Sequence, residues 1–275
     1  MLATYHTHNT FCDGIMGPED YILSAIAKGF AAIGISSHAP VSFETCWTMK
    51  PDRLQGYIET VLELKEKYRD RIQVYLGLET DFYPGAADYR NYPGLDYTIG
   101  SLHFIHHAAG QRYIALDNTP EEFMEARDVI FQGKMRALIE KYYRLLAEML
   151  WERPPSILGH LDVLKKNNTG SRFFNENESW YRKAVEEVLD AVAQQQVIVE
   201  VNTGGIARGY TDEMYPSDWI LARMRERDIP VVLNSDAHRP DMIDAYYPQA
   251  AEKLKAVGYT RQKILLDNIW QDVPL

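Results

Sequence analysis

Short apolar runs alternate with longer segments of helical periodicity along this chain. After the second apolar run, Leu54, Tyr57 and Val61 recur at the spacing of one helix face, with charged residues between them. Because strand and helix patterns alternate, we expect parallel strands in an α/β fold. The seven runs that predict strands are residues 2–5, 31–36, 73–78, 97–101, 156–159, 197–201 and 230–234.

Local signals indicate where three of the helices begin. Pro18 and Pro120 suit the first position of a helix, and two acidic residues follow each of them. Ser217, followed by an aspartate, predicts a third helix start because serine hydroxyls cap free backbone N–H groups. The long helical region over residues 120–151 is expected to form more than one helix.

The chain length fits two domain organisations. A chain of 275 residues suits either one large α/β barrel or two average domains. No repeat of fixed period, low-complexity tract or Gly/Ser-rich linker divides it. We therefore predict a single domain over residues 1–275.

Charge and cysteine usage narrow the choice of partners and compartment. The net charge of −10 argues against sequence-independent binding of nucleic acid, which requires Lys and Arg on the phosphates, but is compatible with a small phosphorylated substrate. Cys12 and Cys46 are too few for a disulfide scaffold and indicate free thiols in a reducing compartment. No signal peptide pattern or membrane-length apolar run is present. We predict a cytoplasmic protein without a membrane partner; the oligomeric state stays open.

Residue types that bind metals follow most of the predicted strands. Because the carboxyl ends of parallel strands share one face of a barrel, side chains at those ends are expected to converge. In His6-Thr7-His8 and Asp236-Ala237-His238, the period-two spacing lets both outer side chains point to one side. The strand-end residues are His6, His8, His38, Glu79, His103, His160, Asp236 and His238.

Imidazoles and carboxylates are the ligands of Zn, Mn and Fe, and cations would relieve the repulsion within such a cluster. Each residue alone has a simpler interpretation. Glu79 could form an ion pair, His103 or His160 could be a hydrogen-bonded core histidine, and Asp13 could be a turn residue before Gly14. Their joint placement at the strand ends favours a metal site.

The ordered set of motifs resembles the polymerase-and-histidinol-phosphatase (PHP) family over nearly the whole chain. The resemblance implies a distorted (β/α)7 TIM-like barrel that binds two or three divalent ions. The segments that carry it are His6-Thr7-His8 with Asp13-Gly14, Ser36-Ser37-His38, Gly77-Leu78-Glu79, Gly100-Ser101-Leu102-His103, Gly159-His160-Leu161-Asp162 and Asn234-Ser235-Asp236-Ala237-His238.

The resemblance also implies a distribution of ligands over three metal ions. One ion would be held by His6, His8, Glu79 and Asp236, and a second by Glu79, His103 and His160. A third would be held by Asp13, His38 and His238. Glu79 would bridge the first two ions, and Glu79, Asp236 and His238 are expected to act directly in catalysis. Metal-activated hydroxide would then attack a phosphate ester.

Candidate phosphate-binding residues lie near these strand ends. Arg208 ends the segment 202–208, which is similar to an Asn-Thr-x-Gly-x-x-Arg stretch of the histidinol-phosphatase branch. Lys166, Ser101 and Ser37 are further candidates, and Arg172 is a lesser one; each could instead be a surface or packing residue.

The predicted activity is that of a phosphoric monoester hydrolase. The resemblance to the histidinol-phosphatase branch implies conversion of L-histidinol phosphate to L-histidinol and phosphate in histidine biosynthesis. Two alternatives are a PHP phosphoesterase for another small ester or phosphotyrosine, and a metal-binding regulatory module without turnover.

Residues beside the predicted ligands are less informative. Four aromatic residues in the loops could line a pocket for an imidazole ring or simply pack in the core. Cys12 is not needed as a nucleophile when a metal hydroxide attacks, and His106 and His107 have no assigned role. The four aromatic residues are Phe43, Trp47, Tyr83 and Phe104.

Overall fold

The seven strands predicted from the sequence lie side by side in one parallel sheet in the computed structural model, which describes residues 1–275. The sheet closes into a barrel because the segment after the first strand pairs with the segment after the last, and His8 N donates to Ala237 O over 2.9 Å. The predicted TIM-like α/β barrel is confirmed. In sheet order the strands are β1 (Ala3–Thr4), β2 (Ala32–Ile35), β3 (Gln73–Asp81), β4 (Tyr97–Ser101), β7 (Ile157–Leu158), β8 (Ile198–Asn202) and β9 (Val231–Asn234).

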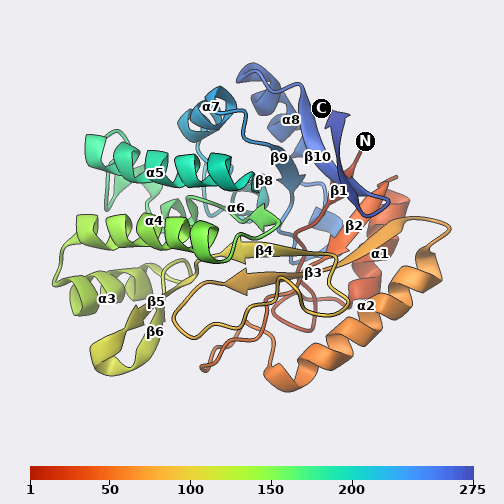
Figure 1. Ribbon diagram of the computed structural model, residues 1–275, viewed down its shortest axis with the longest axis horizontal. Helices are drawn as coiled ribbons and strands as arrows, with labels where there is room; N and C mark the ends of the chain where they lie inside the picture. Colours follow the sequence, from red (N-terminus) through yellow and green to blue (C-terminus); the bar gives the residue numbers. More distant parts are fainter.

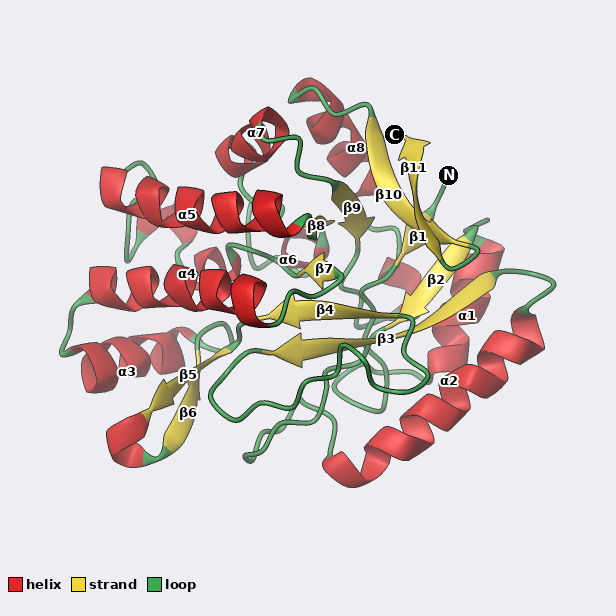
Figure 2. Ribbon diagram, in the orientation of Figure 1, coloured by secondary structure: helices red, strands yellow, loops and turns green.

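Helices pack around the outside of this barrel (Figures 1 and 2). Their starts at Pro18, Pro120 and Asp218 match the sequence signals, and the Thr119 hydroxyl accepts a hydrogen bond from Glu122 N at the second start. The region 120–151 forms two helices, as predicted. The helices are α1 (Pro18–Ala27), α2 (Leu54–Tyr68), α3 (Pro120–Phe131), α4 (Met135–Glu152), α5 (Ser179–Gln195), α6 (Gly204–Ala207), α7 (Asp218–Glu226) and α8 (Tyr247–Ala256), with 3₁₀ turns at Pro51–Arg53, Ala108–Gly110, Val163–Asn167, Thr169–Ser171 and Pro240–Met242.

Two antiparallel hairpins were not predicted from the sequence. The first, β5 (Phe104–His107) with β6 (Arg112–Ala115), projects from the strand-end face after β4. The second, β10 (Arg261–Leu266) with β11 (Ile269–Pro274), turns at Asp267 and Asn268. Both turn residues have positive φ, as a two-residue hairpin turn of type I′ requires.

The C-terminal hairpin closes the end of the barrel opposite the predicted site. Ile264 and Leu265 are buried in a cluster that also contains residues of β1, β3 and β4. The Tyr5 hydroxyl donates to Leu265 O over 2.9 Å and accepts from Leu265 N over 2.8 Å. The N- and C-termini consequently lie near each other (Figure 1).

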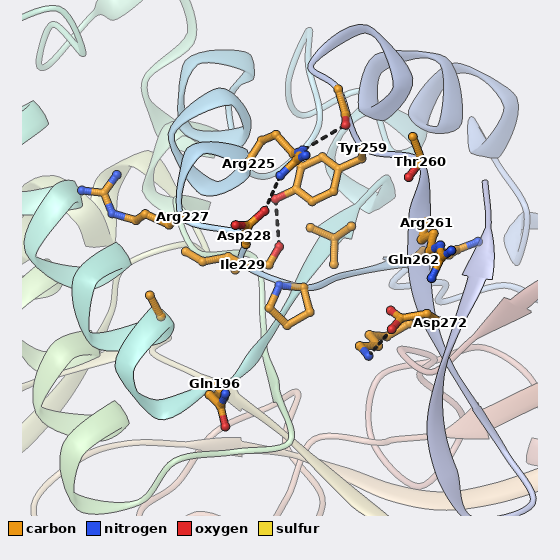
Figure 3. Close-up of a pocket in the computed structure, with 15 residues that line it drawn as sticks. Gln196, Arg225, Arg227, Asp228, Ile229, Tyr259, Thr260, Arg261, Gln262 and Asp272 are labelled. Atoms are coloured by element: carbon orange, nitrogen blue, oxygen red, sulfur yellow. Dashed lines mark hydrogen bonds and ion pairs between the residues drawn. The ribbon is translucent and has the colours of Figure 1, made fainter.

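A hollow of about 580 Å³ lies beside this hairpin, between the end of α7 and the start of β9 (Figure 3). Its arginines are largely engaged within the protein, since Arg225 pairs with Asp228 and Arg227 with Asp190. It contains none of the predicted metal ligands. No helix of the protein combines the length and the apolar character that crossing a bilayer would need.

Candidate metal centre

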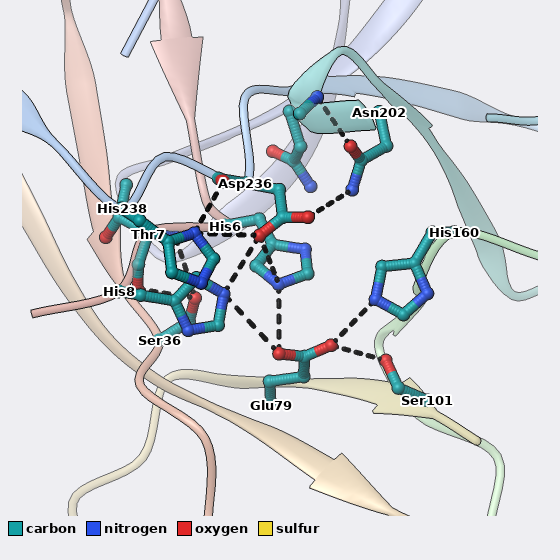
Figure 4. A network of polar contacts seen from close by, with 12 residues as sticks. His6, Thr7, His8, Ser36, Glu79, Ser101, His160, Asn202, Asp236 and His238 are labelled. Carbon is teal, nitrogen blue, oxygen red and sulfur yellow. Dashed lines mark hydrogen bonds and ion pairs between the residues drawn. The ribbon is translucent and has the colours of Figure 1, made fainter. Parts of the chain in front are cut away.

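The structure brings all nine predicted ligands together at the carboxyl ends of the barrel strands. Figure 4 shows six of them: His6, His8, Glu79, His160, Asp236 and His238. Seven of the nine are buried, whereas the side chains of Asp13 and His238 remain 28% and 23% exposed. The site therefore has a buried inner part and a more accessible outer part. The nine residues are His6, His8, Asp13, His38, Glu79, His103, His160, Asp236 and His238.

Four donor atoms form a first cage around one point. Glu79 Oε2 lies 3.1 Å from His6 Nε2 and 3.5 Å from His8 Nε2. Asp236 Oδ1 lies 3.7 Å and 3.1 Å from the same two nitrogens. Four ligands at about 2.1 Å from a tetrahedral ion would be about 3.4 Å apart. These four separations are close to the edge length of a tetrahedral metal site.

Three donor atoms form a second cage on the other side of Glu79. Glu79 Oε1 lies 3.4 Å from His103 Nε2 and 3.0 Å from His160 Nε2, and these two nitrogens are 3.3 Å apart. These separations again match the edges of a tetrahedral site, with one position left open for water or substrate. The two oxygens of one carboxylate thus face two adjacent cages.

The remaining predicted ligands form a wider third group. Asp13 Oδ2 lies 3.2 Å from His238 Nε2, and Asp13 Oδ1 lies 3.9 Å from His38 Nε2. The ring of His238 stacks on His8 with the centroids 4.1 Å apart, which places this group directly beside the first cage. Its looser spacing suits an ion that also binds exchangeable ligands.

Several buried donor atoms of these cages make no hydrogen bond within the protein. They include His6 Nε2, His8 Nε2, Glu79 Oε2 and Asp13 Oδ1. Unsatisfied buried polar atoms are rare in folded proteins, and these four lie in one cluster. Cations bound in the adjacent cages would satisfy these atoms, so the residues fit a multinuclear metal centre.

The electrostatics of the centre favour positive charge beside its carboxylates. Burial raises the pKa of Glu79, but the surrounding His6, His38 and His103 outweigh it and hold that pKa well below its usual range. Burial and the neighbouring His238 and His38 lower the pKa of His8 to about 3. His8 is therefore neutral at physiological pH, which is the form of imidazole that binds metals.

A family model of the PHP domain matches residues 4–204. The chain belongs to the PHP family. It is 30% identical to a probable histidinol-phosphatase of Deinococcus radiodurans over 264 residues, which cover 94% of each chain. It is also 28% identical to a histidinol-phosphatase of Bacillus subtilis, over 90% of this chain and 97% of the relative.

Two solved structures have the same fold as this PHP protein. A putative histidinol phosphatase of Listeria monocytogenes superposes with a TM-score of 0.76 at 22% identity, over 90% of this chain and 99% of that one. A histidinol phosphate phosphatase of Lactococcus lactis, complexed with zinc, L-histidinol and phosphate, superposes with a TM-score of 0.74 at 20% identity, over 98% of both chains.

Two carboxylates outside the cages of this PHP protein orient the candidate ligands. Glu200, fully buried in β8, lies 2.9 Å from His6 Nδ1 and accepts a hydrogen bond from His160 N. Asp81 lies 3.1 Å from His103 Nδ1. A carboxylate at Nδ1 keeps the proton there and directs Nε2 to the metal. Sequence reasoning missed both, although a glutamate inside the apolar run 197–201 was a visible signal.

The predicted phosphate-binding residues have different surroundings in the PHP barrel. Arg208 and Lys166 line a cavity of about 320 Å³ above the cages. Arg208 Nη2 also donates to Asp236 Oδ2 over 2.9 Å, which ties it to the first cage. The Ser101 hydroxyl donates to Glu79 Oε1 over 2.7 Å, and Arg172 lies outside the cavity. The phosphate-binding role of Arg208, Lys166 and Ser101 stays a prediction.

Of the four aromatic residues considered, only Trp47 lines this cavity. Phe43, Tyr83 and Phe104 pack in a separate cluster beside it, and Trp47 stacks on Phe104 with the centroids 4.9 Å apart. The aromatic residues therefore support one wall of the cavity through Trp47. His106 packs against Tyr113 in the β5–β6 hairpin and has no contact with the cages, with the two rings tilted and their centroids 4.8 Å apart.

Proposed function

We propose that this PHP protein is a metal-dependent phosphoric monoester hydrolase that converts L-histidinol phosphate to L-histidinol and phosphate. The proposal rests chiefly on Glu79, whose two oxygens face two adjacent sets of donors with tetrahedral spacing. A pair of adjacent ions is an arrangement that phosphatases use to hold a phosphate and a nucleophile side by side. Length and fold alone would not select this chemistry.

Three groups of residues would bind the metal ions. His6, His8 and Asp236 would hold one ion together with Glu79, while His103 and His160 would hold the second, also together with Glu79. Asp13, His38 and His238 would hold a third ion near the leaving group. Bound divalent ions of this kind lower the pKa of water and so supply hydroxide near neutral pH. Glu79, Asp236 and His238 would be the protein groups nearest the reacting phosphate.

Arg208 and Lys166 would bind the phosphoryl oxygens from the cavity side. Arg208 is held by Asp236, so its guanidinium is already ordered before substrate arrives. A preorganised cation costs less entropy on binding than a free one. The cavity volume of about 320 Å³ suits a small ester.

The choice of L-histidinol phosphate within the PHP family rests on the relatives. The two similar sequences from D. radiodurans and B. subtilis are named as histidinol-phosphatases, and both are matched over at least 90% of their length. The L. lactis structure is a complex with zinc, L-histidinol and phosphate. We therefore place the reaction in histidine biosynthesis.

Phosphate release by the purified protein tests this proposal. The protein is stripped, reloaded separately with Zn, Mn or Fe, and assayed on L-histidinol phosphate beside sugar phosphates, nucleotides and phosphotyrosine. We expect kcat/KM for L-histidinol phosphate to exceed the others by at least about tenfold. A higher kcat/KM for another ester of the panel would support metal-dependent ester hydrolysis but exclude L-histidinol phosphate as the preferred substrate. Full metal occupancy without hydrolysis of any ester would favour the regulatory module instead.

A further inference from the structure

The cavity above the cages contains one carboxylate that belongs to none of them. Four carboxylates line the cavity, and three of these, Asp13, Glu79 and Asp236, are candidate metal ligands. The fourth is Asp117. Any cationic group of a substrate that enters this cavity therefore meets Asp117 as the one negative charge that metal ions would not neutralise.

The backbone around Asp117 is fixed from two sides. Asp117 directly follows Leu116, whose N–H donates to His103 O over 2.8 Å. Leu116 O in turn accepts a hydrogen bond from Asn167 Nδ2 over 3.0 Å. Asp117 is thus held between the segments that follow β4 and β7, both of which carry candidate ligands. The backbone that carries its carboxylate is therefore fixed before substrate binds.

The Asp117 side chain is partly exposed to the cavity, and its carboxylate has room for a further cationic partner. It makes no hydrogen bond within the protein, and its nearest cation is Lys166, whose Nζ lies 3.6 Å from Asp117 Oδ2. The two side chains are 16% and 19% exposed. Burial raises the pKa of Asp117, but Lys166 and the nearby His103 and His160 lower it overall, so the carboxylate is ionised at neutral pH.

We propose that Asp117 binds the ammonium group of a substrate in which an amine and a phosphate ester sit on adjacent carbons, with Lys166 beside it on the phosphate. This inference rests on the proposed function and deepens it. In L-histidinol phosphate only two carbons separate the amine nitrogen from the ester oxygen. The adjacent opposite charges of Asp117 and Lys166 complement that arrangement, so the pair selects 2-aminoalkyl phosphates over esters without the amine.

A matched pair of substrates tests the subsite. The first is L-histidinol phosphate, and the second is 3-(imidazol-4-yl)propyl phosphate, which lacks only the amine. A charge-assisted contact of this kind corresponds to a preference of roughly 10- to 100-fold in kcat/KM for the amine ester in the wild-type protein. Asp117→Asn removes the charge and keeps the shape, so we expect the preference to fall to about threefold or less.

The control is Asp212→Asn, the same chemical change at an exposed residue outside the cavity, which should keep the wild-type preference. An Asp117→Asn variant that retains the preference, or loses activity on both esters by the same factor, would overturn the subsite. The second result would assign Asp117 to the metal centre or the leaving group. A wild-type protein that hydrolyses the two esters equally also overturns it. Hydrolysis of neither ester overturns the proposed function and the subsite together.

Discussion

Replacing Glu200 by glutamine tests how far the metal centre depends on a residue that touches no metal. All four contacts of the buried Glu200 carboxylate are with donor groups, so both oxygens must accept. Glutamine can accept at only one of the two positions, because the other carries an NH₂ group. The four donor groups are His6 Nδ1, His160 N, Asn202 Nδ2 and Asn234 Nδ2.

The hydrogen bonds of Glu200 determine how much metal affinity the Glu200→Gln variant is expected to lose. If the NH₂ group faces His6, the imidazole must accept at Nδ1 and carry its proton on Nε2, the atom that faces the first cage. If it faces His160, two donor groups lose their acceptor, at a cost of about 1–3 kcal/mol each. Loss of such an orienting partner typically weakens metal binding 10- to 100-fold. We expect a weakening in this range for the first cage.

Metal affinity and activity are measured separately. A chelator competition titration gives the dissociation constants of Glu200→Gln and the wild type, and a thermal scan gives both melting temperatures. Phosphatase activity of the variant should recover as the metal concentration is raised, because Glu200 acts through His6 and not on the substrate. Glu63→Gln, an exposed glutamate on α2, is the control. Unchanged metal affinity in Glu200→Gln, with only a lower melting temperature, would refute the orienting role.

Three further predictions concern the metal centre and its surroundings. His8→Ala should lose bound metal and reduce kcat/KM by at least about 100-fold with an unchanged circular dichroism spectrum. His106→Ala serves as its control, and full metal content in His8→Ala would exclude His8 as a ligand. Chelation should lower the melting temperature by roughly 8–16 °C, since binding at about 1,000 times the dissociation constant stabilises the folded state by about 4 kcal/mol; identical melting curves would contradict it. Burial and the adjacent Asp13 raise the pKa of the Cys12 thiol to about 12, so at pH 8 iodoacetamide should modify the exposed Cys46 at least about tenfold faster, as read by peptide mapping. Equal labelling of the two cysteines would show that Cys12 is more accessible and acidic than its surroundings imply.

The barrel could be predicted because its strands are short apolar runs that end in polar residues. Each of the seven predicted runs overlaps an observed strand, and the residues that follow them converge as parallel topology requires. The hairpins were missed for a local reason. β5 contains His106 and His107, and β10 begins at Arg261, so neither reads as an apolar strand. The Asp267-Asn268 turn was the available signal.

The outer layer of the candidate site could not be predicted in the same way. Glu200 contacts His6, 194 residues earlier in the chain, and a contact of that range leaves no spacing pattern in the sequence. Asp117 follows a hairpin strand that was itself missed. Its place in the cavity depends on how Leu116 is held between His103 and Asn167. Such residues become visible only once the topology is known.

The closure of the barrel between Thr7 and Ala237 also orders events during synthesis of the protein. The first cage combines His6 and His8, made at the very start of translation, with Asp236, made near its end. A nascent chain therefore carries its first two donors for most of its synthesis without the carboxylate that completes their cage. The hairpin that closes the barrel's other end emerges later still. Metal loading of the complete first cage would therefore have to follow synthesis of Asp236, and a truncated chain that stops before Asp236 lacks one of the four donors of that cage.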